Sequence, residues 1–308
     1  MSYIRQKIIS GHPYLYEQSN KREGRKVRTH HERYIGKLTS SSSNKDNLGT
    51  TYKQELTPER KVDIELITSA KREIYADKDR KLAIKASERL FEKGLDTKNL
   101  YTNQNTKQYT EERQIIHKII EDEFLTNSET IALESKKPTV ILLGGAPGSG
   151  KSSAILNLLD KKKYVVLDND EIKQKLPEYR GYNASLLHRE SSDIYDAIIL
   201  KAMPSRKNMI LDATLRNTSK AKDMINLFKQ AGYEIKLYGT QLSKEHTVTR
   251  VTHRAIHRGR YVPPEYVIRN TDKINKSVRD LTPYVDEYRI YDTTEFGNPT
   301  IVMEGKNV

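Results

Sequence analysis

A glycine-rich loop offers the clearest chemistry in this chain. Residues 145–152 read Gly-Ala-Pro-Gly-Ser-Gly-Lys-Ser, the pattern of a phosphate-binding P-loop. Glycines let the backbone turn its N–H groups toward phosphate oxygens, and a following helix adds the partial positive charge of its N-terminus. Lys151 would reach the β- and γ-phosphates, and the Ser152 hydroxyl would bind Mg²⁺. We therefore predict an ATP or GTP site built from Gly145, Ala146, Pro147, Gly148, Ser149, Gly150, Lys151, Ser152 and Ser153.

Carboxylates follow two short apolar runs further along the chain. Asp168 and Asp170 come after residues 164–167, and Asp212 comes after residues 209–211. Ligands of open α/β sheets bind at the carboxyl ends of the strands, where a carboxylate can accept a proton from a hydroxyl or hold Mg²⁺. We predict a catalytic base in the first group and a magnesium-holding acid at Asp212. Either acid of the first group can instead cap a helix.

Four arginines precede a Pro-Pro pair and suggest a lid over the phosphates. Arg250, Arg254 and Arg258 are spaced four apart, which places them on one helix face, and Arg260 follows two residues later. Clustered guanidinium groups can clamp a triphosphate and stabilise the charge on a transferred phosphoryl group. The alternative is a solvated basic helix face.

The elements that must position these residues alternate between strands and helices. Strands are predicted at 139–143, 164–167, 209–211 and 235–238, and helices at 151–160, 184–203 and 218–231. Short apolar strands joined by helical crossovers indicate a parallel sheet with helices on both faces. The fold class predicted is therefore α/β, a P-loop kinase-like sheet.

Two smaller regions precede this sheet. Residues 1–53 alternate strand and turn signals and read as a basic β-rich segment, and residues 54–107 read as a charged helical region. The predicted kinase domain then occupies residues 108–308. Its first helix is expected at 110–126.

The charge of the chain is positive and unevenly distributed. There are 54 Lys and Arg against 41 Asp and Glu, and residues 1–53 alone carry 11 Lys and Arg against 4 Asp and Glu. A basic excess favours an acidic partner such as nucleic acid, although a solvated surface explains it equally well. The absence of Cys excludes disulfides, and no apolar run is long enough to span a membrane. A cytoplasmic protein without membrane contact is expected.

Several of these stretches together resemble the zeta toxin family of P-loop kinases. The resemblance covers roughly residues 108–290 and rests on the order and spacing of its motifs. These are 143–153 around the P-loop, 167–173 (Leu-Asp-Asn-Asp-Glu-Ile-Lys), 176–179, 188–192, 211–216 (Leu-Asp-Ala-Thr-Leu-Arg) and 258–263.

The resemblance implies an enzyme that transfers phosphate from ATP to a sugar hydroxyl of a nucleotide of the UDP-N-acetylglucosamine type. It implies Asp170 as the catalytic base, Lys151 as the phosphate-binding lysine, and Arg250 and Arg260 as catalytic lid arginines, with Arg254 and Arg258 beside the nucleotide. Lys173, Asp196, Thr214 and Arg216 would contact the substrate, and Ser152 and Asp212 the metal. The spacing of Arg250 and Arg260 is shorter than is usual in the family, and Asp-Ala-Thr at 212–214 replaces the more usual acid-Gly-Thr.

Other functions stay open at this point. A polynucleotide 5′-hydroxyl kinase could use the basic residues 1–53 to hold nucleic acid. A non-catalytic module could bind nucleotide only to change conformation. The family resemblance also suggests an antitoxin protein as a partner.

Overall fold

The computed structural model describes residues 2–9, 12–23, 26–37, 57–126 and 137–307. The chain divides into two compact units, Met1–Lys61 and Val62–Val308. In the first unit, the backbone forms an antiparallel sheet of β1 (Ser2–Ile9), β2 (His12–Glu23) and β3 (Lys26–Lys37). Within the described ranges, no helix combines the length and the apolar character that a membrane crossing requires.

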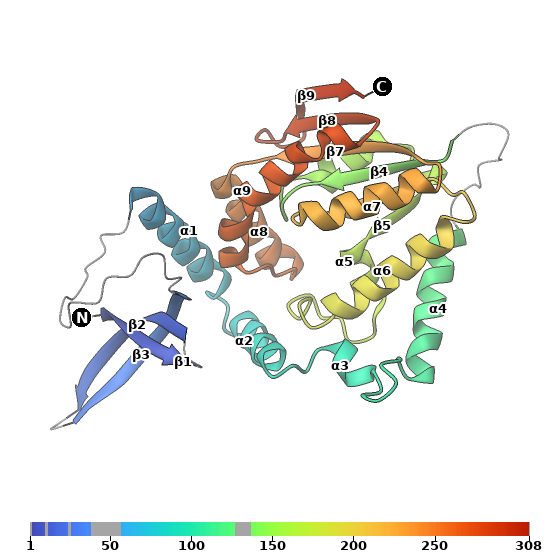
Figure 1. Cartoon of the computed structure of the whole chain (residues 1–308). Helices are drawn as coiled ribbons and strands as arrows, with labels where there is room; N and C mark the ends of the chain where they lie inside the picture. Colours follow the sequence, from blue (N-terminus) through green and yellow to red (C-terminus); the bar gives the residue numbers. More distant parts are fainter. Residues whose placement is uncertain (1, 10–11, 24–25, 38–56, 127–136, 308) are drawn as a thin grey trace. The chain divides into compact units, whose positions relative to one another are not determined.

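The second unit is built on a six-stranded, mostly parallel sheet (Figure 1). The strand order is β5-β6-β4-β7-β8-β9, and only β9 runs antiparallel to its neighbour. The strands are β4 (Thr139–Gly144), β5 (Val165–Asp168), β6 (Met209–Ala213), β7 (Glu234–Gln241), β8 (Glu287–Asp292) and β9 (Thr300–Lys306). The four predicted strands are the first four of these, and β8 and β9 were not predicted.

Nine α-helices are described around this sheet and before it. They are α1 (Pro58–Ile74), α2 (Lys78–Glu92), α3 (Thr97–Tyr101), α4 (Glu111–Thr126), α5 (Asn169–Lys175), α6 (His188–Ala202), α7 (Thr218–Gln230), α8 (Lys244–Arg258) and α9 (Pro264–Asp280). The predicted helix at 184–203 starts later, at His188. Its first four residues form turns instead.

The two faces of the sheet are covered unequally. Side chains alternate along each strand, so Val140 and Leu142 face one side of β4 and Ile141 and Leu143 face the other. The first face carries the large core, to which α6, α7 and α9 contribute. The second carries a smaller cluster with Ala154 and Ile155 from the segment after the P-loop. Helices therefore flank the sheet as predicted, but most of the helical packing lies on one face.

The helix predicted at 151–160 is not an α-helix in the structure. Lys151–Ile155 forms a π-helical turn, in which the N–H of Leu156 donates to the carbonyl of Lys151, and Leu156–Leu158 forms a 3₁₀ turn. Helices in proteins are held mainly by packing of an apolar face. Only Ala154 and Ile155 are buried here, and Leu158 is 67% exposed, so nothing stabilises further helical turns.

Candidate functional site

The P-loop backbone adopts the conformation that its glycines permit. Gly148 and Gly150 have φ of 85° and 88°, in the left-handed region. At Gly145, an added Cβ would lie 2.0 Å from Oγ1 of Thr240. The loop therefore needs glycine for its conformation at Gly148 and Gly150 and for space at Gly145.

Two threonines that the sequence analysis missed hold the loop in place. The Ser149 hydroxyl is fully buried and shares a 2.5 Å hydrogen bond with Oγ1 of Thr240. The Thr293 hydroxyl donates to the carbonyl of Ser149 at 2.7 Å. Thr240 lies near the carboxyl end of β7, which pairs with β4, and this position at a strand end is the signal that could have identified it.

Lys151, Ser152 and Asp212 meet at the carboxyl ends of β4 and β6. The Lys151 ammonium donates to the Gly145 carbonyl at 2.9 Å and lies 3.5 Å from Oδ1 of Asp212. The Ser152 hydroxyl donates to Oδ2 of Asp212 at 3.2 Å. Burial raises the pKa of Asp212, and the nearby Lys151 charge opposes this rise. A hydroxyl and a carboxylate are oxygen ligands suited to Mg²⁺, which usually completes its shell with water and substrate phosphates. Ser152 and Asp212 thus fit the predicted metal site.

Asp168 and Asp170 have different partners. Oδ1 of Asp168 accepts a 2.8 Å hydrogen bond from the backbone N–H of Asp170 and so caps the N-terminus of α5. The carboxylate of Asp170 accepts from Lys173 at 2.9 Å and forms an ion pair with Arg260. The capping alternative therefore applies to Asp168, and the Asp170 carboxylate is held among cations.

Burial lowers the pKa of the two cations that contact Asp170 and of the neighbouring His188. Lys173 is 7% exposed, and burial lowers its pKa to about 8, with Asp168 acting in the opposite direction. Burial also lowers the pKa of Arg260. The pKa of His188 falls to about 4, because its surroundings remove hydration and Lys173 and Arg216 repel a further positive charge. His188 is therefore a neutral neighbour of the site at pH 7.

The α8 arginines are placed differently from one another. Arg250 donates to the carbonyls of Thr293 and Thr294, the first at 2.6 Å. Arg254 is largely surrounded by protein, and its Nε and Nη2 are buried without a hydrogen-bond partner. Burial lowers its pKa, whereas the charges of Asp168 and Asp212 raise it. Arg258, the last residue of α8, is exposed. The Arg254 guanidinium, with two buried nitrogens that have no hydrogen-bond partner, is suited to bind an anion such as a phosphate group. The two nearby carboxylates are suited to a cation that the same phosphate would bind.

The predicted substrate contacts are only partly brought together. Thr214 is half-buried just beyond β6. The exposed Arg216 donates to Oδ1 of Asn270 at 3.3 Å and lies 5.7 Å from the centre of the Tyr266 ring. Asp196 is exposed on α6, and the charges acting on it come from Asp193, Lys220 and Lys98. The neighbours described for Asp196 and for the Arg216 guanidinium thus lie outside the P-loop and Asp170 groups.

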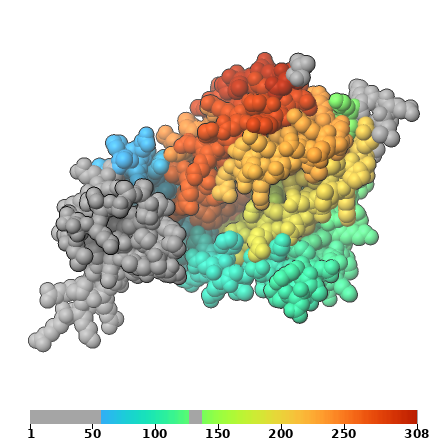
Figure 2. Space-filling model, viewed as in Figure 1, coloured from blue at the N-terminus to red at the C-terminus, as the bar shows by residue number. Residues whose placement is uncertain are grey.

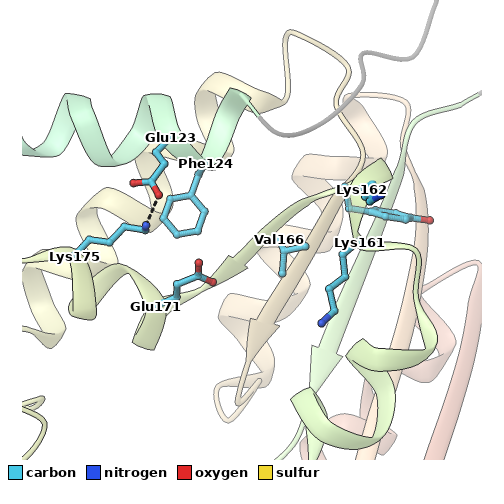
Figure 3. A pocket seen from close by; sticks show the side chains of 8 residues that line it. Glu123, Phe124, Lys161, Lys162, Val166, Glu171 and Lys175 are labelled. Carbon is cyan, nitrogen blue, oxygen red and sulfur yellow. Dashed lines mark hydrogen bonds and ion pairs between the residues drawn. The ribbon is translucent and has the colours of Figure 1, made fainter.

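A separate hollow lies beside edge strand β5 (Figure 3). Its volume is about 380 Å³, and Figure 3 shows Lys175 directed toward Glu123 and the ring of Phe124. Its lining residues are Glu123, Phe124, Lys161, Lys162, Tyr164, Val166, Glu171 and Lys175. None of them is a predicted site residue, so the hollow is distinct from the site described above.

Comparison with known proteins shows the family of this chain. A family model described as zeta toxin matches residues 121–296, more than half of the chain. The chain belongs to the zeta toxin family. This zeta toxin family member is 28% identical to the toxin zeta of Enterococcus hirae over 137 residues, which are 41% of this chain and 48% of that protein. It spans less than half the length of the curated zeta toxins that it matches.

Two further similarities concern proteins outside the named zeta toxins. The chain is 25% identical over 141 residues to a calmodulin calcium-dependent NAD kinase of Arabidopsis thaliana, covering 37% of this chain and 26% of that protein. The crystal structure of AvrRxo1-ORF1 with AvrRxo1-ORF2 and ATP matches with a TM-score of 0.52 at 19% identity. That match covers 65% of this chain and 69% of the other. It shows a shared fold.

Proposed function

We propose that this zeta toxin family member is an ATP-dependent phosphotransferase with Asp170 as its general base. The observation that carries the proposal is the placement of Asp170. Its carboxylate lies between Lys173 and Arg260. Asp170 follows the carboxyl end of β5, and the group of Lys151, Ser152 and Asp212 lies at the carboxyl ends of β4 and β6 in the same sheet. A carboxylate base and positively charged side chains near a phosphate-binding loop are recurring parts of enzymes that transfer a phosphoryl group to a hydroxyl, and this supports the proposal.

The reaction follows from these positions. The acceptor hydroxyl gives its proton to the Asp170 carboxylate as its oxygen bonds to the γ-phosphorus, and the bond from that phosphorus to the β-phosphate oxygen breaks to release ADP. Lys151 and the lid arginines neutralise the charge on the transferred phosphoryl group. Ser152 and Asp212 would hold Mg²⁺, which supplies charge neutralisation on the phosphates.

The acceptor proposed is a sugar hydroxyl of a nucleotide, of the UDP-N-acetylglucosamine type. Membership of the zeta toxin family supports this class, as argued from the sequence motifs. The similarity to a plant NAD kinase supports it independently, because NAD is also a nucleotide with free sugar hydroxyls. NAD is therefore the natural second acceptor to test.

An antitoxin protein is the partner proposed. The matched structure with ATP contains AvrRxo1-ORF1 together with a second protein, AvrRxo1-ORF2, so a relative of this fold is known in a two-protein complex. Nucleic acid would be a partner only through the basic residues 1–53, whose side chains lie outside the described part of the chain.

The deciding experiment is phosphate transfer from γ-labelled ATP with Mg²⁺, comparing wild type with Asp170→Asn. The acceptors are UDP-N-acetylglucosamine, NAD and a 5′-hydroxyl oligonucleotide. Transfer to UDP-N-acetylglucosamine that Asp170→Asn abolishes is the expected result. Transfer to NAD alone would keep the chemistry and change the acceptor. Transfer to the oligonucleotide alone, or to none of the three while ATP is still bound, would overturn the proposed substrate class.

A further inference from the structure

Helices α1 and α2 precede the residues that the family model matches, and they pack directly against α8, the helix that carries Arg250, Arg254 and Arg258. Ala70 of α1 belongs to one apolar cluster with Val248 and Val251 of α8. Ile74 of α1 and Ile84 of α2 belong to a second, and both are fully buried. Figure 2 shows α1 in blue against the orange surface of this region. Residues of α1 and α2, which lie outside the family model, thus complete the apolar core against which α8 packs.

Ion pairs fasten the same helices at both ends of the contact. Lys71 of α1 pairs with Glu265 in the first turn of α9. Lys244, at the start of α8, pairs with Asp272 at 2.9 Å and lies 3.6 Å from Asp63 of α1. Such half-exposed pairs contribute little stability individually. They do fix the register of α1 on α8 and α9, which the apolar contacts alone leave less specific.

Tyr261 connects this packing to the lid loop, residues 259–263, which joins α8 to α9 and carries Arg260. Its ring is 8% exposed and lies in the cluster with Ile74 and Ile84. Its hydroxyl donates to Glu88 of α2 at 3.4 Å. The preceding residue is Arg260, whose guanidinium pairs with Asp170. The backbone that carries Arg260 is therefore anchored by a side chain held on α1 and α2.

Gly181 and Tyr182 also confine the backbone near Arg260. The carbonyl of Gly259 lies so near Gly181 that a Cβ added there would be 2.6 Å from it. The ring of Tyr182 lies against Gly259, and its hydroxyl donates to the carbonyl of Ala255 at 3.4 Å. Residues 259–261 thus contact both Gly181–Tyr182 and the α1–α2 pair.

We propose that α1 and α2 form a brace of the catalytic lid, and that Tyr261 is the positioning residue through which the brace sets Arg260 against Asp170. This inference rests on the proposed function for its kinetic consequence. Arg side chains are long and flexible, so an arginine is placed accurately only if its backbone is fixed. Lys151 and Ser152 lie in the π-helical turn after the P-loop, outside the two apolar clusters that α1 and α2 form. Loss of the anchor should therefore lower kcat and leave ATP affinity unchanged.

The test uses the full chain with Tyr261→Ala, Tyr261→Phe and Tyr233→Ala. Tyr233 is a matched control, because its ring is also buried (4% exposed) and its hydroxyl also makes a hydrogen bond, to Lys207, but it lies at the opposite end of the sheet from the lid. We expect Tyr261→Ala to lower kcat for UDP-N-acetylglucosamine on the order of 10- to 100-fold, as misplacement of a catalytic group by about 1 Å does. Tyr261→Phe, which keeps the ring, should restore most of the rate, and Tyr233→Ala should leave kcat near wild type.

A readout without turnover separates the brace from the proposed function. Amide hydrogen exchange at residues 259–262 should become faster in Tyr261→Ala and in Ile84→Ala, and stay unchanged in Tyr233→Ala. If wild type transfers no phosphate while exchange behaves as expected, the proposed function fails and the brace stands. Unchanged exchange in Tyr261→Ala, or equal kcat losses in Tyr261→Ala and Tyr233→Ala, would overturn the brace.

Discussion

The hydroxyl of Ser152 lies 3.2 Å from Oδ2 of Asp212, although the two residues are 60 positions apart in the chain. Parallel pairing explains the approach, since Leu143 of β4 stands opposite Asp212 of β6. The loop that leaves β4 therefore opens beside the acid that ends β6. Oδ1 of Asp212 lies beside the Lys151 ammonium and Oδ2 accepts from Ser152. Each carboxylate oxygen can accept more than one contact, so Ser152 and Asp212 can still offer a hydroxyl and a carboxylate to one hard cation.

Ser152→Ala should weaken ATP binding only when Mg²⁺ is present. Loss of one metal ligand is expected to cost about 1.4 kcal/mol, roughly tenfold in Kd, because the metal then loses one protein contact. Titration calorimetry with and without Mg²⁺ measures this difference. Ser205→Ala is the matched control, since the Ser205 hydroxyl donates to a backbone carbonyl, that of Lys201, and Ser205 lies between α6 and the amino end of β6, away from the P-loop. An equal loss in both variants, or a loss independent of Mg²⁺, would contradict the metal role of Ser152.

Asp168 and Asp170 should separate into a stability role and a catalytic role. Asp170→Asn removes the proposed base and should lower kcat by roughly 10²- to 10⁴-fold. Asp168→Ala removes the α5 cap and should cost about 1 kcal/mol of unfolding free energy. Kinetics and chemical denaturation on both variants check the division. Losses of kcat of the same size in the two variants would contradict this division between a capping residue and a catalytic base.

The candidate site residues could be proposed from the sequence because their types and spacing are local. The P-loop, the acids after β5 and β6 and the α8 arginines all follow from short patterns, and the structure places Asp170 beside Lys173 and Arg260. Thr240 had only its position near the end of β7 as a signal, and Thr293 had none, because no local pattern tells which distant hydroxyl will meet Ser149. The helix expected at 151–160 failed for a related reason, since its stability depends on packing that the sequence does not reveal.

Gly145→Ala should abolish nucleotide binding. The added Cβ would lie 2.0 Å from the Thr240 hydroxyl oxygen and 2.6 Å from that of Ser149, so the loop would have to move away from β7. Gly232→Ala is the control, because Gly232 also has a positive φ, 78°, but has no atom within 4 Å of an added Cβ. It should cost only about 1 kcal/mol of stability and leave ATP affinity intact. ATP binding by Gly145→Ala at wild-type affinity would contradict the loop geometry described.

Lys173 should make the protein more stable as the pH rises above 8. Burial lowers its pKa from the ordinary value of 10.5 to about 8, so between these values the unfolded chain holds a proton that the folded chain has released. Unfolding free energy should therefore increase over this interval, by about 3 kcal/mol in total. Denaturation of wild type and Lys173→Met at pH 7 and pH 10 measures the change. Lys173→Met should lack the increase, and a rise of equal size in the variant would assign it to other groups.

A buried charge network joins α4 to α6 behind the site and should fail in acid. Glu190 is fully buried and accepts from Arg113, at 2.5 Å, and from His117, at 2.6 Å, while Arg113 also binds Glu178 at 2.9 Å. Burial alone would raise the pKa of Glu190, but these hydrogen bonds lower it to about 2. The folded chain then holds fewer protons than the unfolded chain between about pH 4.5 and pH 2.

The stabilisation from Glu190 is therefore complete above pH 4.5 and is lost as the pH falls toward 2, about 3 kcal/mol in total. Arg113→Met should cost about 3 to 5 kcal/mol at pH 7, because it leaves Glu190 as a buried, uncompensated charge. Lys276→Ala, which breaks an exposed pair with Asp280, is the control and should cost at most about 0.5 kcal/mol. Helix α5, which carries Asp170, contacts α6 through the hydrogen bond from Asn169 to Ser192. Arg113→Met should therefore also lower kcat under conditions where the chain is fully folded. Full activity in folded Arg113→Met would limit the network to a role in stability.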